Sequence, residues 1–491
     1  MHVERPAASG YEIDEGVRSV TQGIARLALI AALGGCRDGG DSSDKGGAVD
    51  TDRDTSGAFD SSVDSAGDSG DTGVVKGAFT LSATPRNLLV ISIDTLRRDA
   101  VGALTGGANT PFLDTLAAEG VLLSHHHSCS SWTYPGSICA MTGLEPEDLG
   151  FVPHVPERTE ELPAVPEGTP TLATVLSEQG YQTGLVTSNL YLGAGTGLGV
   201  GFDQQFGVSG LPAEAITDAA LSMFELALTP ELPWFIHVHY VDPHAPYAPP
   251  DEYLTGIDSL PAVPWDLSTE TGLAELNGAW AGLSAEEQAA ALAHLDLRYS
   301  GEVRYMDDQI ARLVGALDSQ GLLDDTLLMM WSDHGEQLYD HGGRGHTISL
   351  YGEENDGLGL FWARGLSPSV WRQGTTNVDL MPTALWLLDI TPPAGLIGEA
   401  VGTSAQDRPL FSMLAPLGRP PSNSVQVGAS KLVYRWDGTK QLFLRDEDPS
   451  EKANVYDDHP DEVSALWELL GPRVDRAAVM VSDWSPVDAA P

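Results

Sequence analysis

Two carboxylates and a histidine follow two long apolar runs of this chain. The stretch Asp333–Glu336 (Asp-His-Gly-Glu) comes directly after the run Thr326–Ser332, and Asp94 comes directly after the run Asn87–Ile93. Such runs are typical of buried strands in a parallel sheet, whose carboxyl ends meet at one edge. Carboxylate and imidazole groups bind divalent cations. An isolated Asp-His pair is equally typical of a solvated loop, but Asp94 at the end of its own strand favours a metal site.

The elements that must position these residues alternate between strand and helix patterns. This alternation predicts an α/β fold, with a mostly parallel sheet flanked by helices on both faces. We expect strands at Asn87–Ile93, Thr183–Thr187, Pro233–Tyr240 and Thr326–Ser332, and helices at Thr110–Glu119, Thr171–Gln179 and Ala285–Leu317.

The C-terminal part has a different pattern. Two short apolar runs, Lys431–Tyr434 and Gln441–Leu444, flank Asp437-Gly438, which is a hairpin signal. A helical pattern follows at Pro460–Leu470. We therefore expect a catalytic domain over residues 85–425 and a small α+β subdomain over residues 426–491.

The N-terminal residues are typical of a targeting signal. Arg18 and Arg26 precede a short apolar run, and small residues follow before Cys36. The ending Leu-Gly-Gly-Cys resembles a bacterial lipobox, which implies a signal peptide over residues 1–36 and lipidation of Cys36. The run is too short to span a bilayer. The alternative to a signal peptide is the start of a buried helix. The lipobox interpretation predicts an extracytoplasmic protein that is attached to a bacterial membrane by its lipid anchor only.

Residues 37–84 are rich in Asp, Gly, Ser and Thr and carry few large apolar side chains. Such a composition does not bury enough surface to offset the entropy of ordering, so we expect a disordered acidic tether. The folded enzyme is expected to start near Pro85.

Charge and cysteine content exclude some functions. The chain has 70 acidic side chains against 26 Lys and Arg, a formal net charge of −44, and nucleic-acid binding needs basic surfaces. An acidic surface repels anionic substrates unless the site is locally positive, and metal ions supply such charge. The other two cysteines, Cys129 and Cys139, form no zinc-binding pattern, and the sequence leaves open whether they pair.

Several sequence stretches together form a family pattern. They are SIDTLRRD (Ser92–Asp99), NTPFLDTLAAEGV (Asn109–Val121), SSWTYPGSICAMTGLEP (Ser130–Pro146), YVDPHAPYAPP (Tyr240–Pro250), GEVRYMDDQIARLVGAL (Gly301–Leu317), LLDDTLLMMWSDHGE (Leu322–Glu336), GHTISLY (Gly345–Tyr351) and QLFLRDEDPSEKANV (Gln441–Val455). Over roughly residues 85–470 these stretches resemble, in the same order, those of the sulfatase family of the alkaline phosphatase superfamily. The resemblance implies an alkaline-phosphatase-like α/β fold and hydrolysis of an ester.

The family's nucleophile stands in a C/S-x-P-S-R stretch, which here is Thr133–Ser137. The resemblance therefore implies that Thr133 takes the place of the formylglycine cysteine. A hydroxyl near its free pKa is a poor nucleophile, and coordination to a divalent ion activates it. The alternative role of Thr133 is to cap a helix.

The resemblance also implies one bound divalent ion. Its ligands would be Asp94, Asp333, His334 and Thr133. Thr95 occupies a position where the family often has a second aspartate, so the ion could be Ca²⁺, Mg²⁺, Mn²⁺ or Zn²⁺.

The residues on the substrate side depart from the family. His244 matches its substrate-side histidine, which protonates the leaving oxygen or binds the anion. His346 stands where many sulfatases have a lysine, and Asn189 stands in the segment that matches a Lys-Trp-His stretch. Arg97 and Arg344 could replace the missing cations. The alternatives are a core histidine at 244 and solvated charges at the two arginines.

Two further histidine positions carry weaker signals. His341 is another candidate ligand, whereas residues 125–127 (His-His-His) are expected at a strand or loop edge.

The sequence thus predicts a metal-dependent hydrolase of sulfate or phosphate esters, with a small-molecule, glycan or lipid ester as substrate. One alternative is a phosphotransferase of the phosphoethanolamine type. Another is a binding protein with weakened catalysis, because several anion-holding cations are replaced. The loops Gly193–Gly201 and Pro250–Ser284 are expected to select the substrate.

Overall fold

The computed structural model describes residues 74–76, 78–154, 162–226, 228–229, 231–403, 408–416, 418–481 and 484–487. They lie in one compact unit, Gly70–Pro491. The expected signal peptide, Cys36 and the tether up to residue 73 lie outside the described residues. No described helix is both long enough and apolar enough to cross a membrane.

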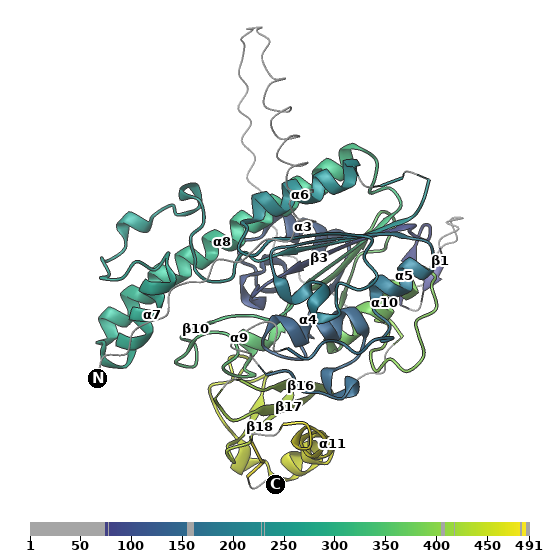
Figure 1. The fold of residues 1–491 in the computed structure, drawn as a ribbon. Coiled ribbons are helices and arrows are strands. Elements are labelled where there is room, and N and C mark those ends of the chain that lie inside the picture. Colours follow the sequence, from purple (N-terminus) through teal and green to yellow (C-terminus); the bar gives the residue numbers. More distant parts are fainter. Residues whose placement is uncertain are drawn as a thin grey trace, which may run out of the picture. The chain divides into compact units, whose positions relative to one another are not determined.

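An eight-stranded sheet forms the centre of this unit (Figure 1), in the order β14-β4-β13-β9-β3-β8-β6-β7. β13 is antiparallel to its neighbours β4 and β9, and the other pairs are parallel. The strands are β3 (Asn87–Ile93), β4 (Val121–Leu123), β6 (Gln182–Thr187), β7 (Gln204–Gly207), β8 (Trp234–Tyr240), β9 (Thr326–Ser332), β13 (Gly359–Ala363) and β14 (Ser369–Trp371). The expected α/β fold is confirmed, and β3 and β9 have the predicted bounds.

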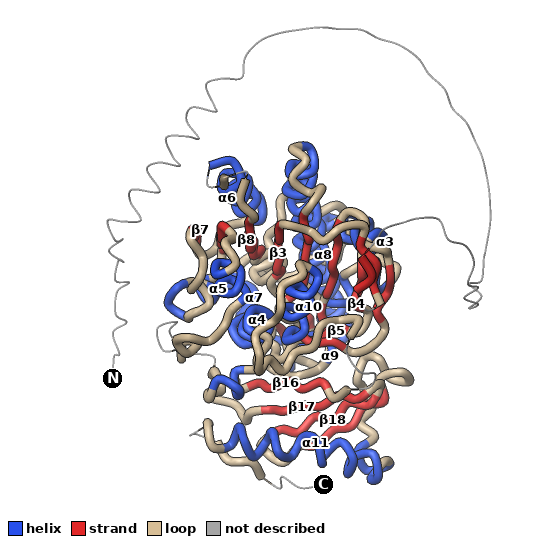
Figure 2. Tube along the Cα trace, turned by 90° about the vertical axis from the view of Figure 1, so that its right-hand side faces the viewer, coloured by secondary structure: helices blue, strands red, loops and turns tan. Residues whose placement is uncertain are grey.

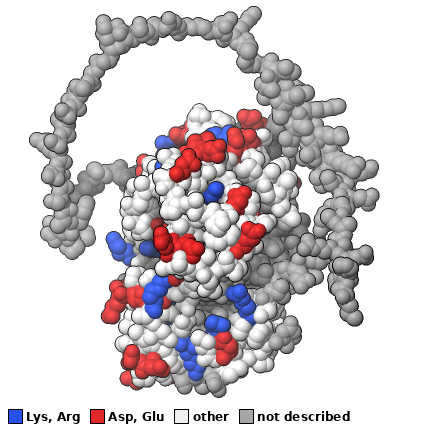
Figure 3. Space-filling view, turned by 90° about the vertical axis from the view of Figure 1, so that its left-hand side faces the viewer, with Lys and Arg blue, Asp and Glu red and all other residues white. Residues whose placement is uncertain are grey.

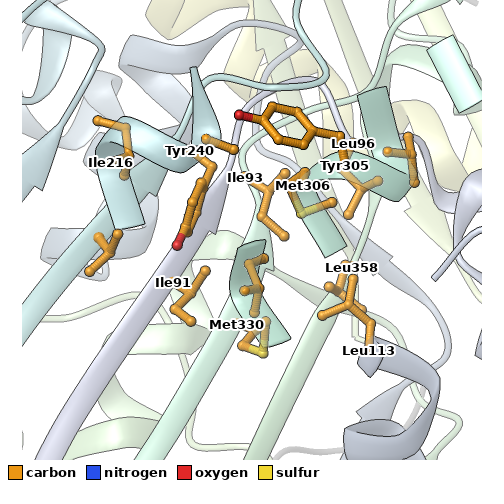
Figure 4. Packing of buried hydrophobic residues seen from close by; sticks show 14 of the residues in the cluster. Ile91, Ile93, Leu96, Leu113, Ile216, Tyr240, Tyr305, Met306, Met330 and Leu358 are labelled. Atoms are coloured by element: carbon orange, nitrogen blue, oxygen red, sulfur yellow. The ribbon is translucent and has the colours of Figure 1, made fainter. Parts of the chain in front are cut away.

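Helices cover both faces of this sheet, which explains why its central strands are apolar throughout. Leu89, Ile91 and Ile93 of β3 pack in one buried cluster, with α3 (Pro111–Glu119), α6 (Ala213–Leu226) and α8 (Ala285–Ser319). Leu88 and Val90 point to the other face and pack with α4 (Thr133–Thr142), α5 (Leu172–Glu178) and α10 (Leu380–Leu387). Figure 4 shows the first cluster, where the strand side chains meet Met306 of α8.

A second, antiparallel sheet follows at the C-terminus (Figure 2), in the order β16-β17-β18-β19. Its strands are β16 (Leu410–Leu414), β17 (Ser422–Val427), β18 (Ser430–Arg435) and β19 (Lys440–Leu444), and α11 (Pro460–Ala478) packs against it. The predicted hairpin and helix are present. The sheet begins at Leu410, however, ahead of the expected boundary at residue 426, and α11 continues well beyond Leu470.

Short elements complete the fold. They include the helices α2 (Gly102–Thr105), α7 (Glu270–Ala279) and α9 (Gly352–Asn355). Two strand pairs are β1 (Val74–Lys76) with β2 (Phe79–Leu81) and β10 (Gln337–Leu338) with β11 (Arg344–Gly345). A three-stranded sheet has β5 (His126–His127) between β12 (Asp356–Gly357) and β15 (Thr375–Thr376).

The strands β1 and β2 precede Pro85, near which we expected the folded enzyme to start. Phe79 and Leu81 are buried although the surrounding composition is polar. The Phe79 ring lies 6.0 Å from that of Trp371 and 6.3 Å from that of Trp386. Two apolar side chains thus attach the end of the acidic segment to the catalytic domain.

The surface in Figure 3 carries clusters of Asp and Glu among more scattered Lys and Arg side chains. A buried lysine, in contrast, links the C-terminal sheet to the catalytic domain. Lys431 of β18 is 2% exposed, lies 3.0 Å from Glu451 Oε1 and donates to the Leu350 carbonyl. The ammonium therefore ties the C-terminal sheet to the loop before α9.

We predict that Lys431→Ala destabilises the protein by about 3 kcal/mol, because it leaves the buried Glu451 carboxylate with Arg445 as its only described cation and removes the donor to the Leu350 carbonyl. Equilibrium unfolding in denaturant measures the change. The matched control is Arg312→Ala, which breaks an exposed pair with Asp218 and should change stability little. Equal losses in the two variants would contradict a structural role for the buried pair.

Candidate active site

Asp94, Asp333 and His334 lie together at the carboxyl edge of the central sheet. β3 and β9 are neighbours, with Ile93 opposite Ser332, so the residues that follow the two strands are brought to one place. One ligand atom from each of the three residues lies within 4.8 Å of the others. All three side chains are fully buried. The structure thus brings together the three candidate ligands that the sequence placed in one site.

Backbone donors orient the cluster. Asp333 Oδ1 accepts hydrogen bonds from the backbone N–H groups of Thr95 (3.1 Å) and His334 (2.8 Å). Thr95 has a φ of 55°, in the left-handed region that is costly for a threonine. His334 Nδ1 lies 2.8 Å from the Gly335 carbonyl, an acceptor, so Nδ1 carries a proton and Nε2 is left free as a ligand.

The remaining atoms of the cluster fit a cation. Asp94 Oδ1 and Asp333 Oδ2 are buried without a hydrogen-bond partner among the described residues, and His334 Nε2 lies 3.6 Å from both. Burial and the charge of Asp94 raise the pKa of Asp333 well above its usual value. Burial also acts to raise the pKa of Asp94, but the neighbouring histidines lower it. A divalent ion would neutralise both carboxylates and use the free oxygens.

Thr133 is the first residue of α4 and lies beside the cluster. Its Oγ1 is 3.5 Å from Asp94 Oδ2, 3.4 Å from His334 Nε2 and 3.5 Å from Asn189 Nδ2. The N-cap of α4 is Trp132, without a side-chain cap, so the hydroxyl of Thr133 does not cap this helix. Its position at the helix N-terminus favours negative charge nearby.

Two features fix α4 against the cluster. A disulfide between Cys129 and Cys139 ties the helix to the segment before it, and it settles the pairing that the sequence left open. A Cβ atom at Gly136 would lie 2.7 Å from the Asp333 carbonyl, so only glycine allows this close approach.

Two histidines, His244 and His346, lie next to the cluster. The ring of His346 lies 4.5 Å from that of His334 and 5.1 Å from that of His244. His346 Nδ1 is 3.3 Å from Glu336 Oε1. Burial acts to lower the pKa of His346, but the charge of Glu336 outweighs it and raises the pKa. The ring of His346 therefore favours positive charge at the site although the chain is strongly acidic.

Asn189 also reaches the cluster, since its Nδ2 donates to Asp94 Oδ2 at 3.0 Å. Arg97 and Arg344 behave differently. Arg97 forms ion pairs with Asp99 (2.6 Å) and Asp340 (2.7 Å), and no described contact joins it to Asp94, Thr133 or the histidines. Arg344 lies in β11, and its charge acts to lower the pKa of the Tyr247 hydroxyl, which burial raises.

His341 is not placed as a ligand. Its Nδ1 pairs with Glu353 at 2.5 Å and its Nε2 faces the Glu451 carbonyl at 2.9 Å, so both ring nitrogens are engaged. His126 and His127 form the short strand β5, as expected for a strand edge.

Sequence reasoning missed two neighbours of the cluster. His239 Nε2 lies 3.6 Å from Asp94 Oδ2, while its Nδ1 contacts Ser92 Oγ at 2.7 Å. Glu336 supports His346 as described above. Two sequence features could have identified these residues. His239 lies near the end of a predicted buried strand, and Glu336 is part of the Asp-His-Gly-Glu stretch.

Comparison with known proteins agrees with this fold. The sequence model of the Sulfatase family matches residues 86–390. An arylsulfatase of Clostridium perfringens is 23% identical over 267 residues, which are 49% of this chain and 53% of the relative. A choline-sulfatase of Rhizobium meliloti is 26% identical over 250 residues, 45% of this chain and 46% of the relative. The chain thus spans about half the length of these relatives.

Solved structures show the same fold. The structure of BT4656 in complex with its substrate D-glucosamine-2-N,6-O-disulfate has a TM-score of 0.65 at 17% identity, covering 80% of this chain and 98% of that one. The phosphonate monoester hydrolase of Silicibacter pomeroyi has a TM-score of 0.62 at 21% identity, covering 81% and 96%. This chain belongs to the sulfatase family, within the alkaline phosphatase superfamily.

We predict that Asp333→Asn has opposite effects with and without metal. It removes the repulsion between two buried carboxylates but keeps an oxygen for the two backbone donors, so the chelator-treated variant should melt a few degrees higher than the wild type. Added Mn²⁺ or Ca²⁺ should raise the melting temperature of the wild type and have much less effect on the variant. Equal metal-induced shifts in both proteins would contradict the ligand role.

Proposed function

We propose that this protein is a metal-dependent hydrolase of sulfate or phosphate esters, with Thr133 as nucleophile. The observation that carries the proposal is the position of Thr133 Oγ1, within 3.5 Å of both Asp94 Oδ2 and His334 Nε2 at the start of α4. No other hydroxyl of the described residues contacts both side chains. An oxygen placed there can coordinate the ion that these ligands would hold.

Asp94, Asp333 and His334 would hold one divalent ion, with Thr133 Oγ1 completing its ligands. The bound ion would lower the pKa of the threonine hydroxyl and offset the charge that develops on the substrate oxygens. Asp94 and Asp333 provide hard oxygen ligands that suit Ca²⁺, Mg²⁺ or Mn²⁺, and His334 extends the possibilities to Zn²⁺.

The chain's own residues then have distinct roles. Attack by Thr133 Oγ1, which gives up its hydroxyl proton to solvent, would form an oxygen–sulfur or oxygen–phosphorus bond and break the ester bond. His244 Nδ1 donates to the Ala245 carbonyl at 2.6 Å, so its Nε2 would have to carry the second proton of an imidazolium ring in order to protonate the departing alcohol. His346 would place positive charge beside the transferred group. Water then releases the group from Thr133.

The substrate is proposed to be a small-molecule, glycan or lipid ester. One structural neighbour is a complex with a sulfated sugar and another is a phosphonate monoester hydrolase, so either central atom is compatible with the fold. Asn189, Arg97 and Arg344 were the candidates to hold the anion. Among them, Asn189 has the contacts expected of such a residue, because it reaches both Asp94 and Thr133.

An extracytoplasmic location is part of the proposal, with attachment to the membrane through a lipid on Cys36. The Cys129–Cys139 disulfide supports it, since such bonds persist mainly in oxidising compartments.

We predict that Thr133→Val lowers kcat by about 10³-fold or more, because it replaces the hydroxyl by a methyl group of similar size. Thr133→Ser keeps the hydroxyl and should retain a measurable fraction of the activity. Both variants should keep most of the metal-induced rise in melting temperature. The measurement is turnover of aryl sulfate, phosphate mono- and diester, and phosphonate substrates with added Mn²⁺, Ca²⁺ or Zn²⁺.

The outcome also separates the alternative functions. Full activity of Thr133→Val would refute the nucleophile. Transfer of the group to an added alcohol in preference to water would indicate a phosphotransferase of the phosphoethanolamine type. Metal binding without turnover on any of these substrates would indicate a binding protein with weakened catalysis.

A further inference from the structure

A cleft of about 830 Å³ lies between the catalytic domain and the C-terminal sheet, and the function proposed above does not use it. The segments that follow β4 and β14 form one wall, and residues of β16 and β17 and the segments after β17 and β19 form another. None of its lining residues belongs to the cluster of Asp94, Asp333, His334 and Thr133 or to the histidine pair next to it. Its volume is that of an ordinary small-ligand site.

The charge of the lining is opposite to that of the chain. Four arginines line the cleft, against the two carboxylates Asp356 and Asp446, whereas the whole chain has a net charge of −44. The arginines are Arg98, Arg372, Arg408 and Arg445. Burial and the charges of Arg98 and Arg445 lower the pKa of His125, another lining residue. The cleft is therefore a locally basic region on an acidic protein.

Two of these arginines already have carboxylate partners and two do not. Arg408 pairs with Asp379, and Arg445 pairs with Asp356. Arg98 donates only to the Ser124 carbonyl, at 3.1 and 3.3 Å, and forms no ion pair with any described residue. Arg372 is exposed and has no hydrogen bond or ion pair among the residues that the structure describes. Both guanidinium groups thus have N–H donors available for an oxyanion.

The rest of the lining suits a sugar ring. Trp371 and Val370 lie beside Arg372, and Val370 is 47% exposed. Aromatic and aliphatic side chains next to polar groups provide a surface for the apolar face of a saccharide. His127 Nε2 and Gln373 Oε1 are buried without a described partner, so the walls have unused hydrogen-bonding capacity.

We propose that this cleft is a second binding site, which holds an anionic saccharide. Arg98 and Arg372 bind its sulfate, phosphate or carboxylate groups, and Trp371 packs against a ring. The site lies apart from the metal cluster, so its existence does not depend on the reaction proposed for Thr133. Its binding would keep a charged glycan chain on the enzyme independently of catalysis.

Isothermal titration calorimetry at low salt tests the proposal, with a heparin-derived tetrasaccharide as ligand and the full chain carrying Thr133→Val to prevent turnover. Saturable binding is expected. Arg98→Ala/Arg372→Ala should weaken it at least about tenfold, through loss of charge-assisted hydrogen bonds. Arg372→Ala alone removes no described contact, so a severalfold loss in that variant cannot come from misfolding.

The matched control is Arg304→Ala/Arg419→Ala, which removes the same charge outside the cleft and should keep the affinity. The desulfated tetrasaccharide should bind much more weakly, and inorganic sulfate should compete only at far higher concentration. Equal affinities of the cleft and control variants would overturn the site. Equal binding of the desulfated sugar, or full competition by sulfate at the concentration of the saccharide, would overturn the proposed ligand class.

Discussion

The mutual repulsion of Asp94 and Asp333 is the constraint on which the rest of the site depends. The parallel pairing of β3 and β9 forces two carboxylates into a fully buried space, and each keeps an oxygen that no described donor reaches. Such an arrangement is costly unless a cation lies between them. The backbone donors of Thr95 and His334 and the amide of Asn189 hold the other oxygen of each carboxylate, so the unpaired oxygens keep the orientation that a bound cation would need.

The parts of the fold that were predictable are those in which burial dictates residue type. β3 and β9 are covered on both faces, so their apolar runs end where the strands end, and the polar residues that follow mark the carboxyl edge. Local sequence patterns did not predict elements that a few long-range contacts stabilise in spite of the local composition. Phe79 and Leu81 stand in a polar segment, yet both are buried, and Phe79 packs on tryptophans that are distant in the sequence. The extra strand β16 likewise depends on its partner β17, which no local pattern of residues 410–414 reveals.

The site was predictable only where a residue has its role through position on a strand or within a motif. Asp94, Asp333 and His334 satisfied both conditions. Arg97 lies within a motif but does not directly follow a strand. Its guanidinium pairs with Asp99 and Asp340, and only the folded structure shows these partners. His239 was missed for the reverse reason: it lies beside Asp94 through the pairing of β8 with β3, a relation between strands that are far apart in the chain.

The replacement of a carboxylate by Thr95 determines what charge the site can accept. The charges of Asp94 and Asp333 together would balance one divalent ion, so the proposed metal centre would be neutral before substrate arrives. A third carboxylate at position 95 would make it negative and would repel a sulfate or phosphate ester over a few ångströms of low-dielectric space. Glu336 also carries charge, but it faces His346 and stabilises a cation there. No described contact joins Arg97 to the cluster, so in the proposed function a neutral metal centre and the ring of His346 would do the work of the missing cations. Such a balance would favour an ester with a single negative charge over a dianion.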